Sequence, residues 1–576
     1  MLKSGTFIKH RILRVILPTA ITYAFLYAAT FIDLSLAGIL FDELAVSAIQ
    51  IDLPINTIGY GIAGIFVSGA VVAIGKEKGK FNDRKADKLL GQAFLTAIVM
   101  GIIASIAYYY GRDSFLNMFN CSPEVFELAK QYFKWIVPMP LVISIRWVLM
   151  VVIEIDADAK TCVVSQMFSF FLNFIISYVC SRTMGIAGLS FGTVCAMTIE
   201  AFIMALHFIK KTNTFKFGIQ FSIKDAKEIM IYGISEGARY FLVAIVDIAI
   251  NLFISLKFGD IYLCVYAIIN LLTDVLDSFS CVPETGNAFG SIFYGERNTI
   301  ELKNLYKFEL KMSLVVGGFF TLVTILFSKQ IPFIYGINSS PTYEASVLAV
   351  LSIGGTSIVA AIMFIVIGGF SLIDQVKTSL LGLTLYSFIM PLALSITGSY
   401  LFGISGFIWG LALNPVFSFL ICSIYLIIKN GFKGYPLYLK KTDEEVYTYD
   451  AIVNHSSIGE ICNFIEDRLA ENNIDKSLTM KIRLLCEELY TRIVELNKDR
   501  KIETECALMI GPSYIRLIVR DSGEMRNYID IDNSIESFNA YCLARLITND
   551  MQTNYSFTNS FNRNGFVFYR SLEKTV

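Results

Sequence analysis

The sequence is poor in charge and in histidine, and both shortages exclude classes of function. Only 17% of its 576 residues are Asp, Glu, Lys or Arg, against about 25% in soluble proteins. The net charge of -1 leaves no basic excess for a nucleic-acid partner. With three histidines, and eleven cysteines that form no CxxC pair, neither a metal site nor a disulfide framework is expected.

Charge is also unevenly distributed along the chain. Residues 378–428 and residues 89–111 contain no Asp, Glu, Lys or Arg. A helix that crosses a bilayer needs about 20 apolar residues, so the first stretch has room for two spans and the second for one. Hydropathy predicts an all-α, multi-pass membrane protein of about twelve transmembrane helices. The predicted spans are residues 12–38, 44–74, 89–110, 127–152, 161–181, 184–209, 228–257, 261–292, 311–328, 345–369, 378–400 and 404–428.

The positions of Lys and Arg predict the orientation of these spans. They gather in the N-terminal arm and after the second, sixth, eighth and twelfth spans, most clearly in residues 76–88. Loops on the opposite side are short or acidic, as at Asp42 and Glu43. Because cytoplasmic loops carry the excess of Lys and Arg, both termini are expected in the cytosol, in the cell (inner or plasma) membrane.

The chain contains an internal repeat. Residues 44–49 (LAVSAI) resemble residues 263–268 (LCVYAI), and Lys160-Thr161 resembles Lys377-Thr378, with offsets of about 217 residues. Six predicted spans separate the partners, so the repeat is parallel. It predicts two six-helix lobes related by an axis along the membrane normal. The lobes and the regions that follow them are residues 1–220, residues 221–430, a basic linker at 431–441, and a domain at 442–576.

Ionisable side chains inside predicted spans are the first candidates for function, because each is costly unless it is paired or hydrated. They are Asp33, Arg146, Glu200, Glu236, Arg239, Asp247, Asp274, Asp277 and Glu284. Asp247 and Asn251 lie four residues apart and share a helix face, as do Asn270 and Asp274. Such oxygens could hold Na⁺, share protons as neighbouring carboxylates do, or form a purely structural hydrogen-bond network.

Asp33 has no basic neighbour on its own predicted helix. Either Arg146 on the fourth span neutralises it, or its carboxylate is protonated, hydrated or bound to an ion. The second group of alternatives makes Asp33 a candidate for coupling transport to H⁺ or Na⁺.

The first span resembles that of the multidrug and toxic compound extrusion (MATE) family, in Leu17-Pro18 and in residues 31–38 (FIDLSLAG). The resemblance covers residues 10–430 and includes residues 171–175 (FLNFI). It implies two six-helix bundles around a central cleft, and export of organic, often cationic, compounds in exchange for Na⁺ or H⁺.

The same resemblance assigns roles to single residues. Asp33 matches the acidic residue of the family's first helix and Asn173 the Asn of its fifth. Ser177 stands where some members have an Asp. Asp247 corresponds to the acid of the seventh helix, displaced by about one turn. The acid of the tenth helix is absent from residues 345–373, and Asp274 and Asp277 are its candidate substitutes.

The C-terminal domain has ordinary soluble composition. Its pattern predicts a strand, helices at 456–473 and 476–498, two strands within 503–521, a helix at 534–549 and two strands within 551–572, which make an α+β sandwich. This order resembles the histidine-kinase-like ATPase fold of small anti-sigma-factor kinases.

Two segments carry that resemblance, residues 485–489 (LCEEL) and residues 520–523 (RDSG), and they make Glu488, Asp521 and Gly523 candidate nucleotide-binding residues. The sequence also departs from the pattern. Arg492 replaces the Mg²⁺-binding Asn, Met525 replaces a glycine, and residues 538–540 lack the glycines that let backbone amides reach phosphate. A non-catalytic domain that regulates the transporter or binds a cytosolic protein is expected, with nucleotide binding without turnover as the alternative.

Three functions remain open from the sequence. The first is a secondary active exporter of small organic compounds, a multidrug-type antiporter rather than an enzyme, without a cofactor beyond its coupling ion. Its acidic spans and abundant aromatics, 46 Phe and 29 Tyr, suit cationic cargo. The second is a flippase for a lipid-linked precursor, which a cleft rich in Arg and Lys would favour. The third is a membrane-anchored sensor whose C-terminal domain sequesters a partner.

Overall fold

The computed structural model describes most of the chain. The described residues are 6–79, 83–119, 121–155, 159–209, 222–280, 282–283, 286, 289–290, 293–294, 296–338, 341–372, 375–432, 444–497, 500–524, 551–558 and 561–570. Most of the predicted linker 431–441, the predicted helix 534–549 and the side chain of Asp277 lie outside this set.

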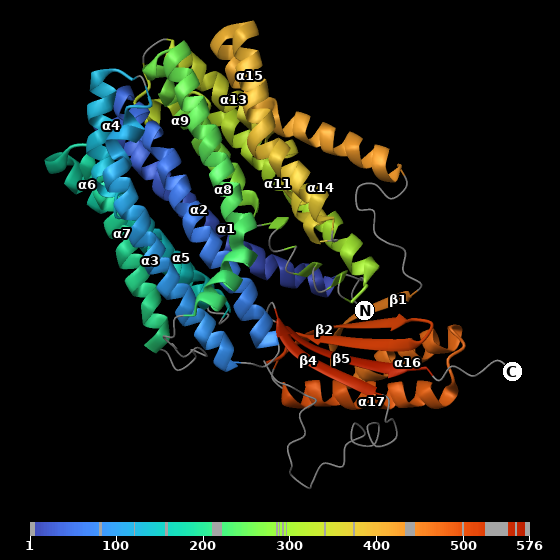
Figure 1. Cartoon of the computed structure of the whole chain (residues 1–576). Helices are drawn as coiled ribbons and strands as arrows, with labels where there is room; N and C mark the ends of the chain where they lie inside the picture. The colour runs from blue at the N-terminus through green and yellow to red at the C-terminus, as the bar shows by residue number, and fades with distance from the viewer. Residues whose placement is uncertain are drawn as a thin grey trace.

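The first part of the chain is a bundle of long helices (Figure 1). They are α1 (Thr6–Leu40), α2 (Glu43–Gly79), α3 (Asp83–Leu116), α4 (Pro123–Ile136), α5 (Met139–Ile155), α6 (Ala159–Met184), α7 (Ala187–Ala205), α8 (Ile223–Lys257), α9 (Leu263–Asp277), α11 (Thr299–Phe327), α12 (Gln330–Ile334), α13 (Thr342–Leu372), α14 (Val376–Thr384) and α15 (Met390–Asn430). A π-helical turn, Leu385–Ile389, joins α14 to α15.

The chain is a multi-pass membrane protein. Within the described residues, seven helices are long and apolar enough to cross a membrane, and eight if the bent pair α4 and α5 counts as one span. Helix α15 is broken at Phe402 and Gly403, where Gly403 has a φ of +62° that favours glycine. The break falls between the predicted spans 378–400 and 404–428, which confirms that boundary. The total of about twelve spans stays a prediction.

The two predicted lobes meet along α2 and α8, which run side by side over most of their length. Glycines allow the close approach: a Cβ at Gly69 would lie 1.9 Å from the carbonyl oxygen of Ile229, and one at Gly233 would lie 1.7 Å from that of Ile65. Gln50 extends this contact, because its Nε2 lies 3.3 Å from Oδ1 of Asn251. The backbones themselves are therefore in contact, as small residues permit in membrane helices.

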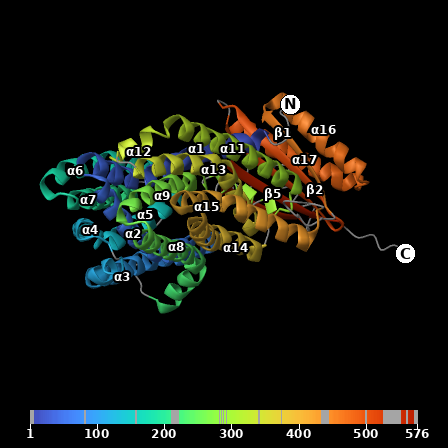
Figure 2. The same ribbon diagram turned by 90° about the horizontal axis from the view of Figure 1, so that it is seen from above.

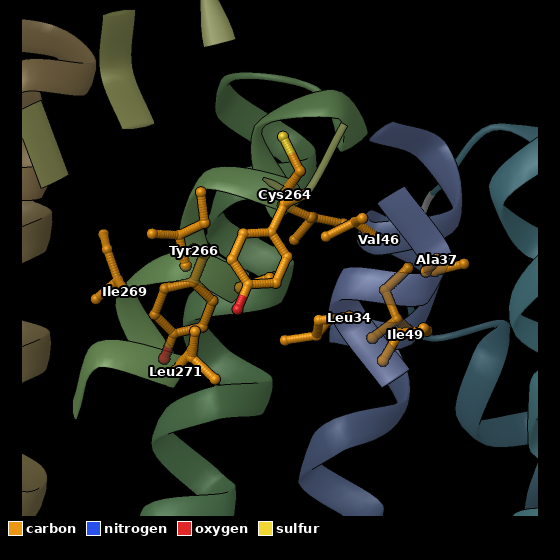
Figure 3. Packing of buried hydrophobic residues seen from close by; sticks show 14 of the residues in the cluster. Leu34, Ala37, Val46, Ile49, Cys264, Tyr266, Ile269 and Leu271 are labelled. Atoms are coloured by element: carbon orange, nitrogen blue, oxygen red, sulfur yellow. The ribbon is translucent and has the colours of Figure 1, made fainter. Parts of the chain in front are cut away.

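The two copies of the sequence repeat lie next to each other in the core. Ala45, Val46 and Ile49 of α2 and Cys264, Ala267 of α9 are fully buried in one hydrophobic cluster. Figure 3 shows Val46 and Ile49 on one side of this cluster, with Leu34 of α1, and Cys264 and Tyr266 on the other. The two segments that carry the predicted repeat thus share one core, and the pseudo-symmetry of the two lobes stays a prediction.

The C-terminal domain is an α+β unit. It contains β1 (Glu445–Val453), α16 (His455–Glu471), α17 (Lys476–Leu496), β2 (Ile502–Ile510), β3 (Tyr514–Asp521), β4 (Met551–Thr558) and β5 (Phe561–Tyr569). The strands form one antiparallel sheet of order β1-β2-β3-β5-β4. The predicted order of strands and helices is confirmed for the described residues.

Alternation along the strands gives the sheet two different faces. Cys506, Leu508 and Leu517 pack with α16 and α17 in the domain's hydrophobic core. Glu505 and Arg520 alternate with these residues along their strands and therefore lie on the opposite face of the sheet, where both are fully buried. Figure 1 shows the helices on the side of the sheet that faces away from the bundle. Seen from above, the domain lies toward α14 and α15, away from α4 and α6 (Figure 2).

Candidate functional site

Asp33 lies near the end of α1 and is 3% exposed. The Tyr132 hydroxyl from α4 donates to its Oδ2 at 2.9 Å. The Thr193 hydroxyl from α7 lies 3.0 Å from Oδ1 and 2.8 Å from Oδ2. Helices α4 and α7 thus converge on this carboxylate of α1, and each supplies it with one neutral hydrogen-bond donor. No basic side chain among the described residues pairs with Asp33.

Asn173 and Ser177 of α6 join this cluster. The Oδ1 of Asn173 lies 3.1 Å from the Thr193 hydroxyl and accepts from the Ser177 hydroxyl at 2.8 Å. A hydroxyl has one hydrogen to donate, so Asp33 and Asn173 compete for that of Thr193. The structure therefore brings together Asp33, Asn173 and Ser177, the three candidates of the first lobe.

Arg146 does not neutralise Asp33. Its Nη1 lies 3.2 and 3.3 Å from the two carboxylate oxygens of Glu200, and both side chains are buried. This pair lies at the edge of a small pocket beside the Asp33 cluster. The pocket is lined by Phe25, Arg146, Gln166, Ser169, Phe170, Asn173, Thr193, Ala196, Met197 and Glu200.

We expect Arg146→Met alone to lower the free energy of unfolding by about 3–5 kcal/mol, because it leaves Glu200 buried without its cation. Adding Glu200→Gln should recover most of the loss, as judged by thermal unfolding of the detergent-solubilised protein. The matched control adds Asp33→Asn in place of Glu200→Gln. Rescue by that control instead would mean that Arg146 pairs with Asp33 in the membrane.

Of the candidate coupling residues in the second lobe, only some lie in contact with one another. Asp247 of α8 accepts from the Tyr266 hydroxyl of α9 at 2.7 Å and is also hydrogen-bonded to Asn270. Asn251 turns instead to the other lobe, where its Nδ2 donates to the Gln50 carbonyl at 3.1 Å. Asp247 and Asn251 thus hydrogen-bond to different partners, and a shared ion or proton site on this helix face stays a prediction. Asp274 is half-buried one turn beyond Asn270 on α9.

Asp52 of α2 is a buried carboxylate that the sequence reasoning missed. It is fully buried, and neither of its oxygens has a hydrogen-bond partner among the described residues. Its signal was visible as the single charge within residues 44–74. Tyr132 and Thr193 were also missed, and no charge pattern could have identified them because their hydroxyls are neutral.

At the bundle end opposite the sheet, the lobes touch through a group we call the distal contact: Gly38, Glu43, Tyr335, Gly336, Asn338 and Thr342. A Cβ at Gly38 would lie 2.0 Å from the carbonyl carbon and oxygen of Tyr335. The Glu43 carboxylate accepts from the Asn338 backbone at 3.1 Å and from the Thr342 hydroxyl at 2.8 Å. Nearby loops add a hydrogen bond from the Ser122 amide to Asp260.

The candidate nucleotide residues of the C-terminal domain are occupied by contacts within the domain. Glu488 pairs with Arg492 at 3.4 Å. Asp521 is fully buried and accepts from the Gly523 amide and from Asn562, both at 2.9 Å. The Glu488 carboxylate is therefore already paired with a cation of its own helix.

We expect residues 442–576 to fold on their own, because their hydrophobic core is formed within the domain, and to hydrolyse no ATP. A phosphate-release assay on the purified domain checks this, with Glu488→Ala as the control. Turnover that is abolished by Glu488→Ala would contradict the expectation.

Residues 18–179 match the MatE family model. No curated protein matches the chain. Solved structures do: the inward-facing conformation of a multidrug resistance MATE family transporter of the MOP superfamily has a TM-score of 0.62 at 16% identity, covering 73% of this chain and 97% of that one. The outward-facing conformation of such a transporter gives 0.58 at 17% identity, with 74% and 98% covered.

A MOP superfamily transporter from Pyrococcus furiosus, whose binding pocket is described as having reversed polarity that suggests a different function, gives a TM-score of 0.60 at 16% identity. The match covers 74% of this chain and 98% of that transporter. At such identities the likeness shows the fold. The helical part of this chain therefore has the fold of MATE transporters of the MOP superfamily.

Proposed function

We propose that the protein is a secondary active antiporter that exports small organic, cationic or amphipathic compounds in exchange for H⁺ or Na⁺. The observation that carries the proposal is the environment of Asp33. A carboxylate that is 3% exposed and held by Tyr132 and Thr193 alone is costly to keep charged. Binding H⁺ or Na⁺ relieves this cost, so occupancy of the site changes which conformation is favoured.

The charges beside Asp33 suit a cation better than a lipid diphosphate, and the pocket there, about 20 Å³, has room for a coupling ion rather than for the cargo itself. Its lining contains one basic residue, Arg146, and that charge is already neutralised by Glu200. Phe25 and Phe170 meet edge to face at its rim, with ring centroids 5.3 Å apart. Aromatic faces attract organic cations. This favours an exporter over a flippase.

With both termini in the cytosol, the C-terminal domain lies on the cytosolic side and the distal contact on the outer side. The candidate nucleotide residues of the C-terminal domain pair or hydrogen-bond with other residues of that domain. This supports a regulatory role for the domain rather than a catalytic one. A sensor without transport activity is the remaining alternative.

Purified protein in proteoliposomes tests the proposal, with fluorescent organic cations as cargo and with Na⁺ and pH gradients imposed separately. Cargo movement that depends on one gradient is expected. Movement that ignores both gradients would contradict antiport. Absence of cargo movement, in full-length protein and in a chain truncated to residues 1–440 alike, would favour the sensor.

A further inference from the structure

The C-terminal domain holds the start of α1 through its sheet. The Asp450 carboxylate of β1 accepts from the backbone amides of Thr6 and Phe7, at 2.7 and 3.1 Å. These are the first amides of α1, which have no partner within the helix, so Asp450 caps it. One turn later, Glu503 of β2 lies 3.1 Å from His10 and 3.5 Å from Arg11.

The same sheet face holds the second lobe through a buried ion cluster. Glu296, which precedes α11, pairs with Arg520 of β3 and lies 2.6 Å from Arg563 of β5. Arg520 also lies 2.8 Å from Glu505 of β2, and its guanidinium stands over the ring of Phe293. Glu296, Glu505 and Arg520 are each 2% exposed or less.

The electrostatics of this cluster depend on its being complete. Burial raises the pKa of Glu505 well above its ordinary value, and the nearby Arg520 acts in the opposite direction. For Arg520, burial alone would lower the pKa, but Glu296 and Glu505 outweigh it and the pKa is raised. Removing one partner would therefore leave a desolvated charge, so the interface should open rather than tolerate the change.

An aromatic contact joins the two attachments. Phe561 of β5 meets Phe7 of α1 edge to face and stacks on Phe289 of the second lobe, with ring centroids 5.9 and 6.0 Å apart. All three side chains are fully buried. Arg297, the residue after Glu296, forms an ion pair with Glu444, the residue before β1, at 2.8 Å. The start of α1 also packs directly on the second lobe, because Phe7 and Ile12 share a buried cluster with Leu302 and Leu305. One sheet thus contacts α1 and the second lobe at the place where they meet.

We propose that the C-terminal domain is an inhibitory clamp, whose sheet face fixes α1 to the second lobe at Glu296 and so holds the transporter in the conformation with the distal contact closed. The clamp rests on the proposed function in one respect, that the lobes move relative to each other during transport. Movement of α1 against the second lobe would have to disturb their direct packing and also break the sheet's contacts at α1 or at Glu296, because hydrogen bonds join the strands between them into one sheet.

Helix α1 connects the clamp to the candidate site. It begins at the Asp450 cap, carries Asp33 about two turns before its other end, and contains Gly38 of the distal contact in its last turn. A domain that binds one arrangement of α1 shifts the equilibrium by its difference in affinity between arrangements. Undocking should therefore shift the equilibrium between the two conformations by about 5- to 150-fold, the usual span of coupling between two sites, and raise the transport rate in consequence.

The experiment uses the full chain and two changes on opposite sides of the interface, Glu296→Gln in the lobe and Arg520→Met in the domain. Arg563→Met, whose side chain is 27% exposed, is a milder third variant if either of these fails to fold. The matched control is Arg500→Met, which removes an exposed ion pair with Glu524 in the same domain. Hydrogen exchange and cargo transport in proteoliposomes are the two readouts.

All three interface variants should expose the amides of residues 6–11, and should also speed exchange at residues 331–338 of the distal contact and raise transport. Arg500→Met should change none of these. The clamp is wrong if residues 6–11 become exposed while the distal contact and the transport rate stay as in wild type, or if no variant undocks. If even wild type moves no cargo, the proposed export fails, whereas faster exchange at residues 331–338 would still support the clamp.

Discussion

Asp33→Asn should leave the protein folded and inserted while most of its ion-driven transport is lost, because ion binding no longer changes the affinity for cargo, a coupling usually worth about 5- to 150-fold. The amide has the shape of the carboxylic acid, so Thr193 can still donate to its oxygen. Tyr132, which donates to Oδ2 of the native carboxylate, can rotate its hydroxyl to accept from the new NH₂ group. The variant therefore resembles a permanently protonated Asp33.

Transport is measured in proteoliposomes under imposed pH and Na⁺ gradients, and folding by thermal unfolding. Asp33→Glu is the companion variant, and it should retain part of the activity because the charge survives with a longer reach. Thr193→Val is the control for the hydrogen bond alone and should preserve the dependence on the gradient. Full gradient-driven export by Asp33→Asn would refute a coupling role for this residue.

Much of the fold was accessible from the sequence because the bilayer imposes long apolar stretches. The break in α15 at Phe402 and Gly403 falls between two predicted spans. In the C-terminal domain, strand alternation and helix periodicity placed α16 and α17 within a few residues of their predicted bounds. These patterns depend on local burial, which a sequence records directly.

The site was less accessible because its partners come from different helices. The sequence left Arg146 as a possible partner of Asp33, but Arg146 meets Glu200 of α7. It placed Asn251 on the same helix face as Asp247, but it gave no sign that Asn251 meets Gln50 across the lobes. Helix spacing says which residues share a face, and it does not say which neighbour that face meets. The domain's attachment at Glu296 had no sequence signal for the same reason.

Gly38→Val should separate the lobes at the distal contact and abolish most of the transport. A Cβ at this position would lie 2.0 Å from the backbone of Tyr335, where no side chain can move aside. Reciprocally, a Cβ at Gly336 would lie 2.1 Å from the Gly38 carbonyl oxygen, so this is a contact of backbone with backbone. Overpacking of this kind costs about 1–3 kcal/mol.

That cost falls only on conformations in which the contact is closed. An exporter that must close its outer side in each cycle would therefore be held open, and a difference of about 1.4 kcal/mol already changes the equilibrium tenfold. Hydrogen exchange at residues 331–338 should become faster, and the buried ring of Tyr335, 1% exposed, should become accessible. Gly318→Val is the matched control, because a Cβ at Gly318 would meet nothing within 4 Å. Equal loss of transport in both variants would show that valine harms the helices in general, and would remove the argument that closure at Gly38 is a step of the cycle.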